Sequence, residues 1–274
     1  MVDKTKIEGL LAKYFTTTGT ITIDDLGLVS CSGNVELKRQ WQFTQLPVRF
    51  EKVDGSFSCD RNTLQSLEGS PRVVGGSFIC MYNYLSGSLK GGPTQVGRNY
   101  VCSGNQLGSL EGAPESVGGN FNCNNNLLES LSGAPQKVWS FNCGNNQLES
   151  LEGAPSTVAD SFHCRDNRLK NLVGAPAVVP GEFDCIYNPL RSLDGLPQEI
   201  GTKLFLTYKK NLPLLRCLTA KRGVGFFLKS GIGQKGDAQA VALILNRYQA
   251  QGEAGAFQCG ADLAAAGFKA NARW

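Results

Sequence analysis

Apolar positions recur along the middle of the chain with a period close to 21 residues. Each period begins with an aromatic residue, a variable residue and a cysteine, and continues as x-x-Asn-x-Leu-x-Ser-Leu-x-Gly-x-Pro-x-x-Val. Seven such repeats follow one another, spaced by 20 to 22 residues. The aromatic residues are Phe57, Phe78, Tyr100, Phe121, Phe141, Phe162 and Phe183, and the cysteines are Cys59, Cys80, Cys102, Cys123, Cys143, Cys164 and Cys185. The repeated asparagines are Asn62, Asn83, Asn105, Asn126, Asn146, Asn167 and Asn188.

This pattern predicts one short strand per repeat. The aromatic residue and the cysteine are two positions apart, so both side chains point to the same, inner face of the strand. Stacked repeats would place their strands side by side in a parallel sheet. The asparagine side chain can bond backbone groups that are left free where the chain leaves the strand. Because Gly-x-Pro favours a tight bend, we expect the rest of each repeat to be loop or extended chain.

A period of 20 to 29 residues with this order of columns is the leucine-rich-repeat signature, with Phe and Cys in two positions usually held by Leu. Val35 with Leu37, and Leu204 with Leu206, continue the strand positions by one repeat at each end, which makes nine strands. The predicted fold is therefore an α/β repeat, a leucine-rich-repeat solenoid over residues 32–210 with parallel strands on its concave face.

We expect caps at both ends, because a repeat stack exposes its apolar core there. In the N-terminal cap, residues 1–31, a helical stripe and a strand or two over 21–29 are predicted; the stripe is Ile7, Leu10, Leu11 and Tyr14. The C-terminal domain, residues 211–274, is predicted to hold three short helices. Asn211 and Asp237 are the expected caps of the first two, and Gly267 is expected to end the third.

Composition excludes several classes of protein. No apolar run approaches the roughly 18 residues of a membrane helix, and the charged N-terminal stretch does not resemble a secretory signal. The chain has ten cysteines without a CxxC pair and a single histidine. Repeated cysteines inside a wall of Phe and Leu are expected to be buried thiols, which indicates a reducing compartment, namely the cytoplasm. No metal, cofactor or small-molecule substrate is expected.

Three features of the sequence are candidates for catalysis. Gly231-Ile-Gly233-Gln-Lys-Gly236 matches GxGxxG, but no second strand follows it as a dinucleotide site requires. His163 lies on the outward side of a strand without a nucleophile that the pattern identifies, so it is expected to recognise a partner together with Arg165. Cys259 and Asp262 are the one pair in the C-terminal domain that could be catalytic. Cys259 is more simply explained as a core residue. The chain is therefore expected not to be an enzyme.

The outward strand positions are polar in the middle repeats and become apolar or aromatic toward both ends. Exposed aromatic residues and Met on a rigid surface are enriched at protein interfaces. The predicted partner-binding residues are Ile79, Met81, Tyr82, Val101, His163, Arg165, Ile186, Tyr187, Phe205 and Tyr208. The alternative is that some of them pack under a cap or under the terminal helices, Phe205 and Tyr208 above all.

Charge favours a second hypothesis. Residues 203–274 hold 11 Lys and Arg against 3 Asp and Glu, whereas residues 1–202 hold 16 against 20. A basic tail of this kind could contact nucleic acid. The predicted basic patch consists of Lys221, Arg222, Lys229 and Lys235.

The repeat Phe121-Asn-Cys-Asn-Asn-Asn-Leu-Leu-Glu-Ser-Leu-Ser-Gly-Ala-Pro135 resembles those of leucine-rich-repeat proteins encoded by tailed bacteriophages. The stretch over 45–59 and the ending Ala270-Asn-Ala-Arg-Trp274 are similar to that family too. The resemblance implies a scaffold made in the bacterial cytoplasm, and it supplies no catalytic residues. We therefore expect a non-enzymatic scaffold that binds and inhibits a host bacterial protein, such as an anti-phage defence component, through its concave face. A nucleic-acid-contacting protein and a structural or adhesive virion component are the alternatives.

Overall fold

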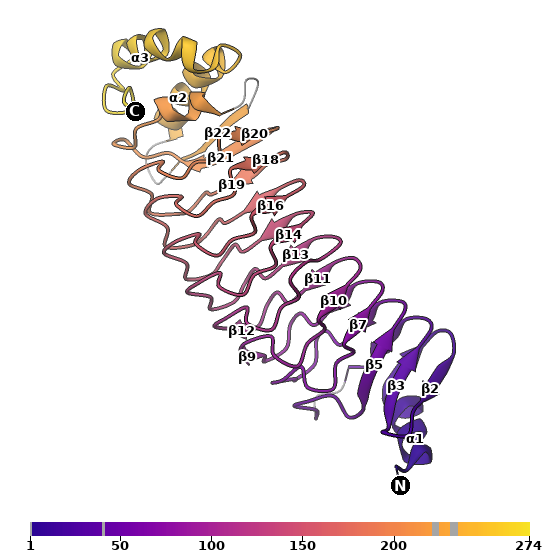
Figure 1. Cartoon of the computed structure of the whole chain (residues 1–274). Helices are drawn as coiled ribbons and strands as arrows, with labels where there is room; N and C mark the ends of the chain where they lie inside the picture. Colours follow the sequence, from indigo (N-terminus) through magenta and orange to yellow (C-terminus); the bar gives the residue numbers. More distant parts are fainter. Residues whose placement is uncertain (1, 40–41, 221–224, 231–234) are drawn as a thin grey trace. The chain divides into compact units, whose positions relative to one another are not determined.

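The computed structural model describes residues 2–39, 42–220, 225–230 and 235–274. The chain divides into two compact units, Met1–Asn142 (unit 1) and Cys143–Trp274 (unit 2). Both are repeat solenoids in which successive turns of the chain stack on one another (Figure 1). The predicted division into an N-terminal cap, a solenoid and a helical domain is based on the kinds of secondary structure expected, not on compactness. It stays a prediction.

Unit 1 contains a main sheet of very short strands. Its members in sheet order are β1 (Phe15–Thr17), β4 (Val35–Leu37), β6 (Phe57–Ser58), β8 (Phe78–Ile79), β11 (Tyr100–Val101), β13 (Phe121–Asn122) and β15 (Phe141–Asn142). β1 runs antiparallel to β4, and each later strand pairs in parallel with the one before it. Six of the nine predicted strands are therefore confirmed in this unit.

A second sheet runs along another side of unit 1, and Figure 1 shows several of its strands side by side. Its strands in sheet order are β10 (Gln95–Val96), β7 (Val73–Val74), β5 (Arg49–Val53), β3 (Leu28–Cys31) and β2 (Ile21–Ile23). The remaining strands of this unit are β9 (Ser86–Gly87), β12 (Gln106–Leu107) and β14 (Lys137–Val138). Helix α1 (Lys4–Tyr14) precedes β1, and its Leu11 is buried. The predicted N-terminal helix and the strands near 21–29 are thus present.

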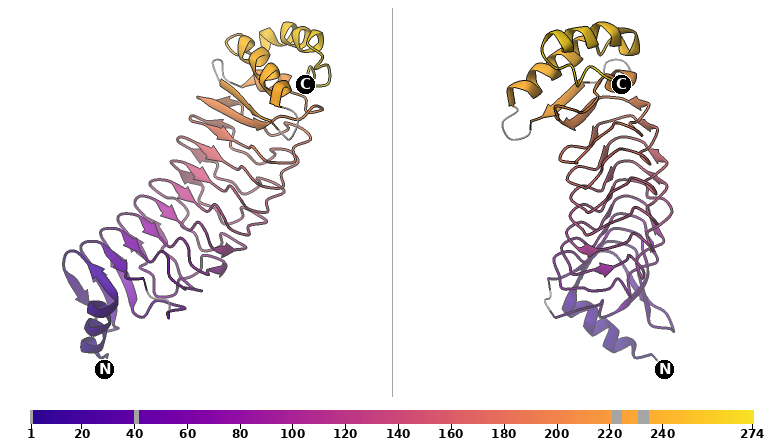
Figure 2. Two further views of the ribbon diagram at one scale, coloured as in Figure 1. Left: turned by 180° about the vertical axis from the view of Figure 1, so that it is seen from behind. Right: turned by 90° about the vertical axis from the view of Figure 1, so that its left-hand side faces the viewer.

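Unit 2 continues the same alternation and then ends in helices. Its main strands are β17 (Phe162–His163), β19 (Phe183–Asp184), β21 (Lys203–Thr207) and β22 (Gly225–Lys229), which pair in parallel in this order. Its other strands are β16 (Thr157–Val158), β18 (Val178–Val179) and β20 (Glu199–Ile200). The helices are the 3-10 helices η1 (Leu215–Thr219) and η2 (Gly252–Gly255), with α2 (Lys235–Tyr248) and α3 (Ala256–Ala265). Both views in Figure 2 place α2 and α3 beyond the last strands of unit 2.

The core of both units is built from the aromatic and cysteine columns, whose side chains are fully buried. Neighbouring rings stack: the centroids of Phe57 and Phe78 lie 5.8 Å apart, and those of Phe162 and Phe183 lie 5.7 Å apart. The alternation of aromatic and cysteine positions therefore places a continuous apolar layer behind the strands, as the sequence predicts.

The repeated asparagines join each turn to the turn before it. The Asn126 side-chain nitrogen Nδ2 donates to the carbonyls of Cys102 and Cys123 at 3.1 and 3.0 Å, and its Oδ1 accepts the Leu107 N–H at 3.0 Å. Asn167 repeats the arrangement with Cys143, Cys164 and Leu148, and so does Asn188 one turn later. Buried backbone groups that a loop would leave unpaired are thereby satisfied.

The C-terminal region differs from the sequence prediction in three respects. Strand β22 extends the sheet where only helix was expected. The first expected helix is the short 3-10 helix η1, whose N-cap position is Leu214 without a side-chain cap, so the predicted capping role of Asn211 is wrong. Asp237 lies within the first turn of α2 rather than before it. Gly267 follows α3 with φ +89°, in the left-handed conformation that commonly follows a helix.

Candidate protein-binding surface

The outward side of the main sheet carries the predicted binding residues of unit 1. Ile79 and Val101 are direct neighbours on β8 and β11, and both side chains are half-buried. Met81 follows β8 and is half-buried as well. Because these positions alternate with core positions, their side chains lie on the side of the sheet that faces away from the core.

Tyr82 stands at the turn that follows β8 and is 52% exposed. Its backbone is left-handed, with φ +53°, a conformation that bulky residues rarely adopt. The ring lies over Gly104, where an added Cβ would come within 2.5 Å of the Tyr82 ring carbon Cδ1. The Arg61 guanidinium lies 5.5 Å from the ring centroid. These neighbours hold the exposed ring in one place, which lowers the entropy lost when a partner binds it.

Tyr187 occupies the equivalent turn of unit 2, with φ +56° and 47% of its surface exposed. Its backbone N–H donates to the Thr207 hydroxyl of the next turn. The residue before each repeated asparagine adopts this left-handed conformation in several repeats, and Gly104 supplies it in one of them. The turn geometry, rather than the strand, therefore directs both tyrosines to solvent.

His163 and Arg165 flank Cys164 on the outward side of unit 2. The His163 Nδ1 lies 3.9 Å from the Asp184 Oδ2, and Asp184 is buried with its Oδ1 accepting the Ile186 N–H. Arg165 is exposed and pairs with Asp166 at 3.5 Å. The Cys164 thiol is buried on the opposite side of the strand, and burial raises its pKa well above the ordinary value. His163 therefore lies beside the polar side chains of Asp184 and Arg165, and the Cys164 thiol is on the other side of the strand.

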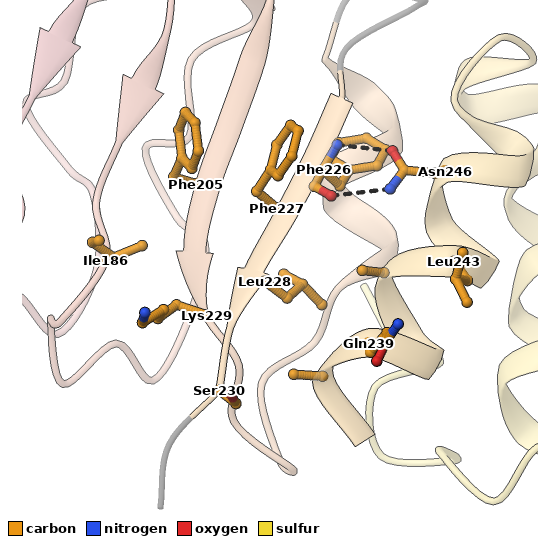
Figure 3. Close-up of a pocket in the computed structure, with 12 residues that line it drawn as sticks. Ile186, Phe205, Phe226, Phe227, Leu228, Lys229, Ser230, Gln239, Leu243 and Asn246 are labelled. Atoms are coloured by element: carbon orange, nitrogen blue, oxygen red, sulfur yellow. Dashed lines mark hydrogen bonds between the residues drawn. The ribbon is translucent and has the colours of Figure 1, made fainter. Parts of the chain in front are cut away.

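Unit 2 also contains an apolar pocket of about 620 Å³ between the last strands and helix α2 (Figure 3). Phe205 and Phe227 stack on neighbouring strands with ring centroids 5.0 Å apart, and Ile186 lies beside them. The facing wall comes from α2. The residues that line the pocket are Ile186, Phe205, Phe226, Phe227, Leu228, Lys229, Ser230, Ala238, Gln239, Ala242, Leu243 and Asn246. Two predicted binding residues, Ile186 and Phe205, are thereby brought together.

Sequence reasoning missed Phe227 and the α2 wall of this pocket. A signal for the strand was present, because Phe226 and Leu228 stand 22 residues after Leu204 and Leu206 and repeat their alternation. The asparagine and Gly-x-Pro columns are missing from that turn, so the repeat pattern did not indicate it.

Tyr208 is a correction to the predicted surface, because its side chain is buried. Its hydroxyl donates to the Asn271 Oδ1 at 3.3 Å, and burial raises its pKa. Asn271 in turn donates to the carbonyls of Lys209 and Leu212 at 3.0 and 2.8 Å. The tyrosine therefore anchors the C-terminal segment and offers no ring to a partner.

The predicted basic patch is only partly within the described residues. Lys221 and Arg222 lie outside them, as does the side chain of Lys235. Lys229 is exposed at the end of β22 and lines the apolar pocket.

All ten cysteines are buried free thiols. Burial raises the pKa of the Cys217 thiol to about 12, and burial together with Asp262 raises that of Cys259 to about 11. The Asp262 carboxylate is occupied by the Tyr248 hydroxyl at 2.7 Å and by Arg247 at 3.0 Å. Among the described residues, no group of three or more His, Cys, Asp or Glu could hold a metal ion. Residues 231–234 of the GxGxxG sequence lie outside the described residues.

No protein-family model matches the chain, and no curated protein or solved structure shows significant similarity to it. In the part of the chain that the structure describes, no helix combines the length and apolar character needed to cross a membrane.

Proposed function

We propose that this chain is a non-enzymatic protein-binding scaffold and that unit 2 holds its partner at the pocket between β22 and α2. The observation that carries the proposal is the stacked pair Phe205 and Phe227, which faces an apolar helix wall across about 620 Å³. Phe227 and Leu243 are both exposed, at 47% and 65%. Aromatic side chains in a preformed apolar pocket are typical of the centres of protein interfaces.

We further propose that the scaffold is of the leucine-rich-repeat kind and is encoded by a tailed bacteriophage. The order of its Phe, Cys, Asn, Leu and Gly-x-Pro columns supports this proposal. On that basis the partner is a host bacterial protein, and binding inhibits it; a component of anti-phage defence fits this role.

Affinity purification from infected bacterial cells tests the binding function with two matched variants. Leu243 is 65% exposed on the pocket wall, so Leu243→Asp removes apolar contact area without disturbing the core. Phe257 is 88% exposed on α3 and does not line this pocket, so Phe257→Asp is the control. A stoichiometric host protein should be recovered with the wild type and the control and lost with Leu243→Asp. Equal recovery with both variants would refute the site.

Nucleic-acid binding is the second candidate function. The specific observation is the excess of basic residues over 203–274, where Lys209, Lys210, Lys229, Lys269 and Arg273 have no ion pair with the described residues. Recovery that nuclease treatment abolishes, with an affinity that falls steeply as salt rises, would favour this candidate. Presence of the chain in purified virions would instead favour a structural or adhesive role.

A further inference from the structure

Strand β22 is an edge strand of its sheet and lines the pocket. Among the described residues it is the last strand of its sheet, and it pairs in parallel with β21. The Gly225 N–H donates to the Thr202 carbonyl, and the Lys229 carbonyl accepts the Tyr208 N–H. In a parallel pair the backbone groups of alternate residues face the same neighbour. The backbone N–H and carbonyl groups of Gly225, Phe227 and Lys229 therefore point toward β21. Those of Phe226 and Leu228 point away from β21, toward the edge of the sheet.

The first of these two edge residues is already paired by a side chain. The Phe226 N–H donates to the Asn246 Oδ1 at 2.8 Å, and the Asn246 Nδ2 donates to the Phe226 carbonyl at 2.9 Å, as Figure 3 shows. The amide of Asn246 thus supplies the donor and the acceptor that one residue of a further strand would supply. Helix α2 positions this amide against the edge.

Leu228 is the second edge residue, and it also lines the pocket. Neither its N–H nor its carbonyl has a hydrogen-bond partner in the part of the chain that the structure describes. An unpaired donor and acceptor at a sheet edge are a template for another extended chain. The pocket therefore combines apolar walls with one backbone pair suited to a strand.

The residues that line the pocket carry positive but no negative charge. Its lining contains one basic residue, the exposed Lys229, and no acidic residue. The Lys203 ammonium lies 5.8 Å from the Phe227 ring centroid, on the rim of the same face, and is paired with Glu182 at 3.1 Å. Residues 203–274 hold 11 basic against 3 acidic residues. A ligand segment with acidic side chains beside its apolar ones would be complementary to this site.

We propose that the pocket binds an extended, acidic and apolar segment of a partner protein, which pairs with the backbone of Leu228 as an added strand. This inference rests on the proposed binding function and specifies how the partner is recognised. Backbone pairing gives such a segment its position, and alternate side chains enter the pocket between Phe227 and Leu243. A helical ligand would leave the Leu228 groups unpaired.

The test uses the full chain and a displayed random-peptide library. Enriched peptides should alternate apolar residues with Asp or Glu. Their affinity should fall about tenfold or more with Leu243→Asp and stay within about twofold with Phe257→Asp. Lys229→Glu should weaken acidic peptides and should not weaken neutral ones.

Methylation of single backbone nitrogens of an enriched peptide then tests the strand itself. An added strand predicts that methylation weakens binding at alternate positions, about tenfold at the position that pairs with Leu228. Peptides that need Leu243 but show no sensitivity of period two would overturn the strand and leave the proposed binding function standing. Failure to enrich any peptide that depends on Leu243 would overturn both. Association of two copies of this chain, seen by sedimentation and abolished by Leu243→Asp, would also overturn the proposal of a foreign segment.

Discussion

Replacing Tyr100 by Phe should stabilise the protein. Tyr100 is the one tyrosine in the aromatic column, and its ring centroid lies 5.1 Å from those of both Phe78 and Phe121. The hydroxyl is buried without a hydrogen-bond partner among the described residues, and burial raises its pKa well above the ordinary value. An unpaired buried polar group costs about 1 to 3 kcal/mol, so Tyr100→Phe should raise the free energy of unfolding by roughly 1 to 2 kcal/mol.

The Gly-x-Pro bend that precedes Tyr100 contains Gly92, which compensates for the size of the tyrosine side chain. Four other repeats have alanine where this bend has Gly92. A Cβ at Gly92 would lie 3.0 Å from the Tyr100 hydroxyl, and equally close to Leu67 Cδ1 and to the Leu89 carbonyl oxygen. Glycine therefore makes room for the tyrosine. Gly92→Ala should destabilise the wild type by about 1 kcal/mol or more, and it should cost less in the Tyr100→Phe background, where only the contacts with Leu67 and the Leu89 carbonyl remain. The coupling free energy of the pair should reach roughly 1 to 2 kcal/mol.

Urea unfolding followed by circular dichroism gives the four free energies of this cycle. Because repeat proteins can open turn by turn, hydrogen exchange of the backbone amides near Gly92 provides a local measurement of the same effect. Phe121→Tyr is the matched control, since Ala113 occupies the corresponding space and no glycine makes room for the hydroxyl. A loss of stability in Tyr100→Phe, or an equal cost of Gly92→Ala in both backgrounds, would refute the reasoning.

Three further predictions concern the repeat core. Asn126→Leu should lower the free energy of unfolding by about 2 kcal/mol or more, because it leaves the buried Leu107 N–H unpaired and removes one donor each from the carbonyls of Cys102 and Cys123. Asn120→Ala at an exposed position should change it by less than about 0.5 kcal/mol in the same urea assay. Burial raises the pKa of the stacked thiols above their ordinary value of 9.0, so thiols of the unfolded chain ionise first as the pH rises. Stability should be complete below pH 9.0 and fall above it by about 1.4 kcal/mol per thiol per pH unit, and an unchanged urea midpoint near pH 10 would contradict this. Ellman's reagent should label fewer than about one thiol of the native chain within minutes and all ten after denaturation, since only an exposed thiolate reacts.

The strands were predictable because two independent patterns agree on them. The alternation of Phe57 with Cys59 sets the inner face, and its return every 20 to 22 residues repeats that face in each turn. All nine expected strands are present, six in unit 1 and three in unit 2. Gly112 illustrates the bends, since its φ of +91° is open to glycine and strained for other residues.

The candidate site was less predictable because it depends on contacts between distant parts of the sequence. Tyr208 follows a strand as Tyr187 does. Its hydroxyl, however, donates a hydrogen bond within the core to Asn271, which lies 63 residues later in the sequence. Similarly, Asn246 meets Phe226 across 20 residues and places the helix wall of the pocket. No periodic pattern encodes either contact.

The asparagine bonds also give the stack a direction. Asn126 bonds to the carbonyl of Cys123 in its own turn and accepts the Leu107 N–H of the turn before, so each new turn completes a hydrogen bond that its predecessor left open. A chain leaving the ribosome could therefore lengthen a folded stack one turn at a time, always toward the C-terminus. Asn188 is the last member of this series, and the place of the next one is taken by Lys209. Growth by this template stops there, and the tail that follows is free to carry a different architecture.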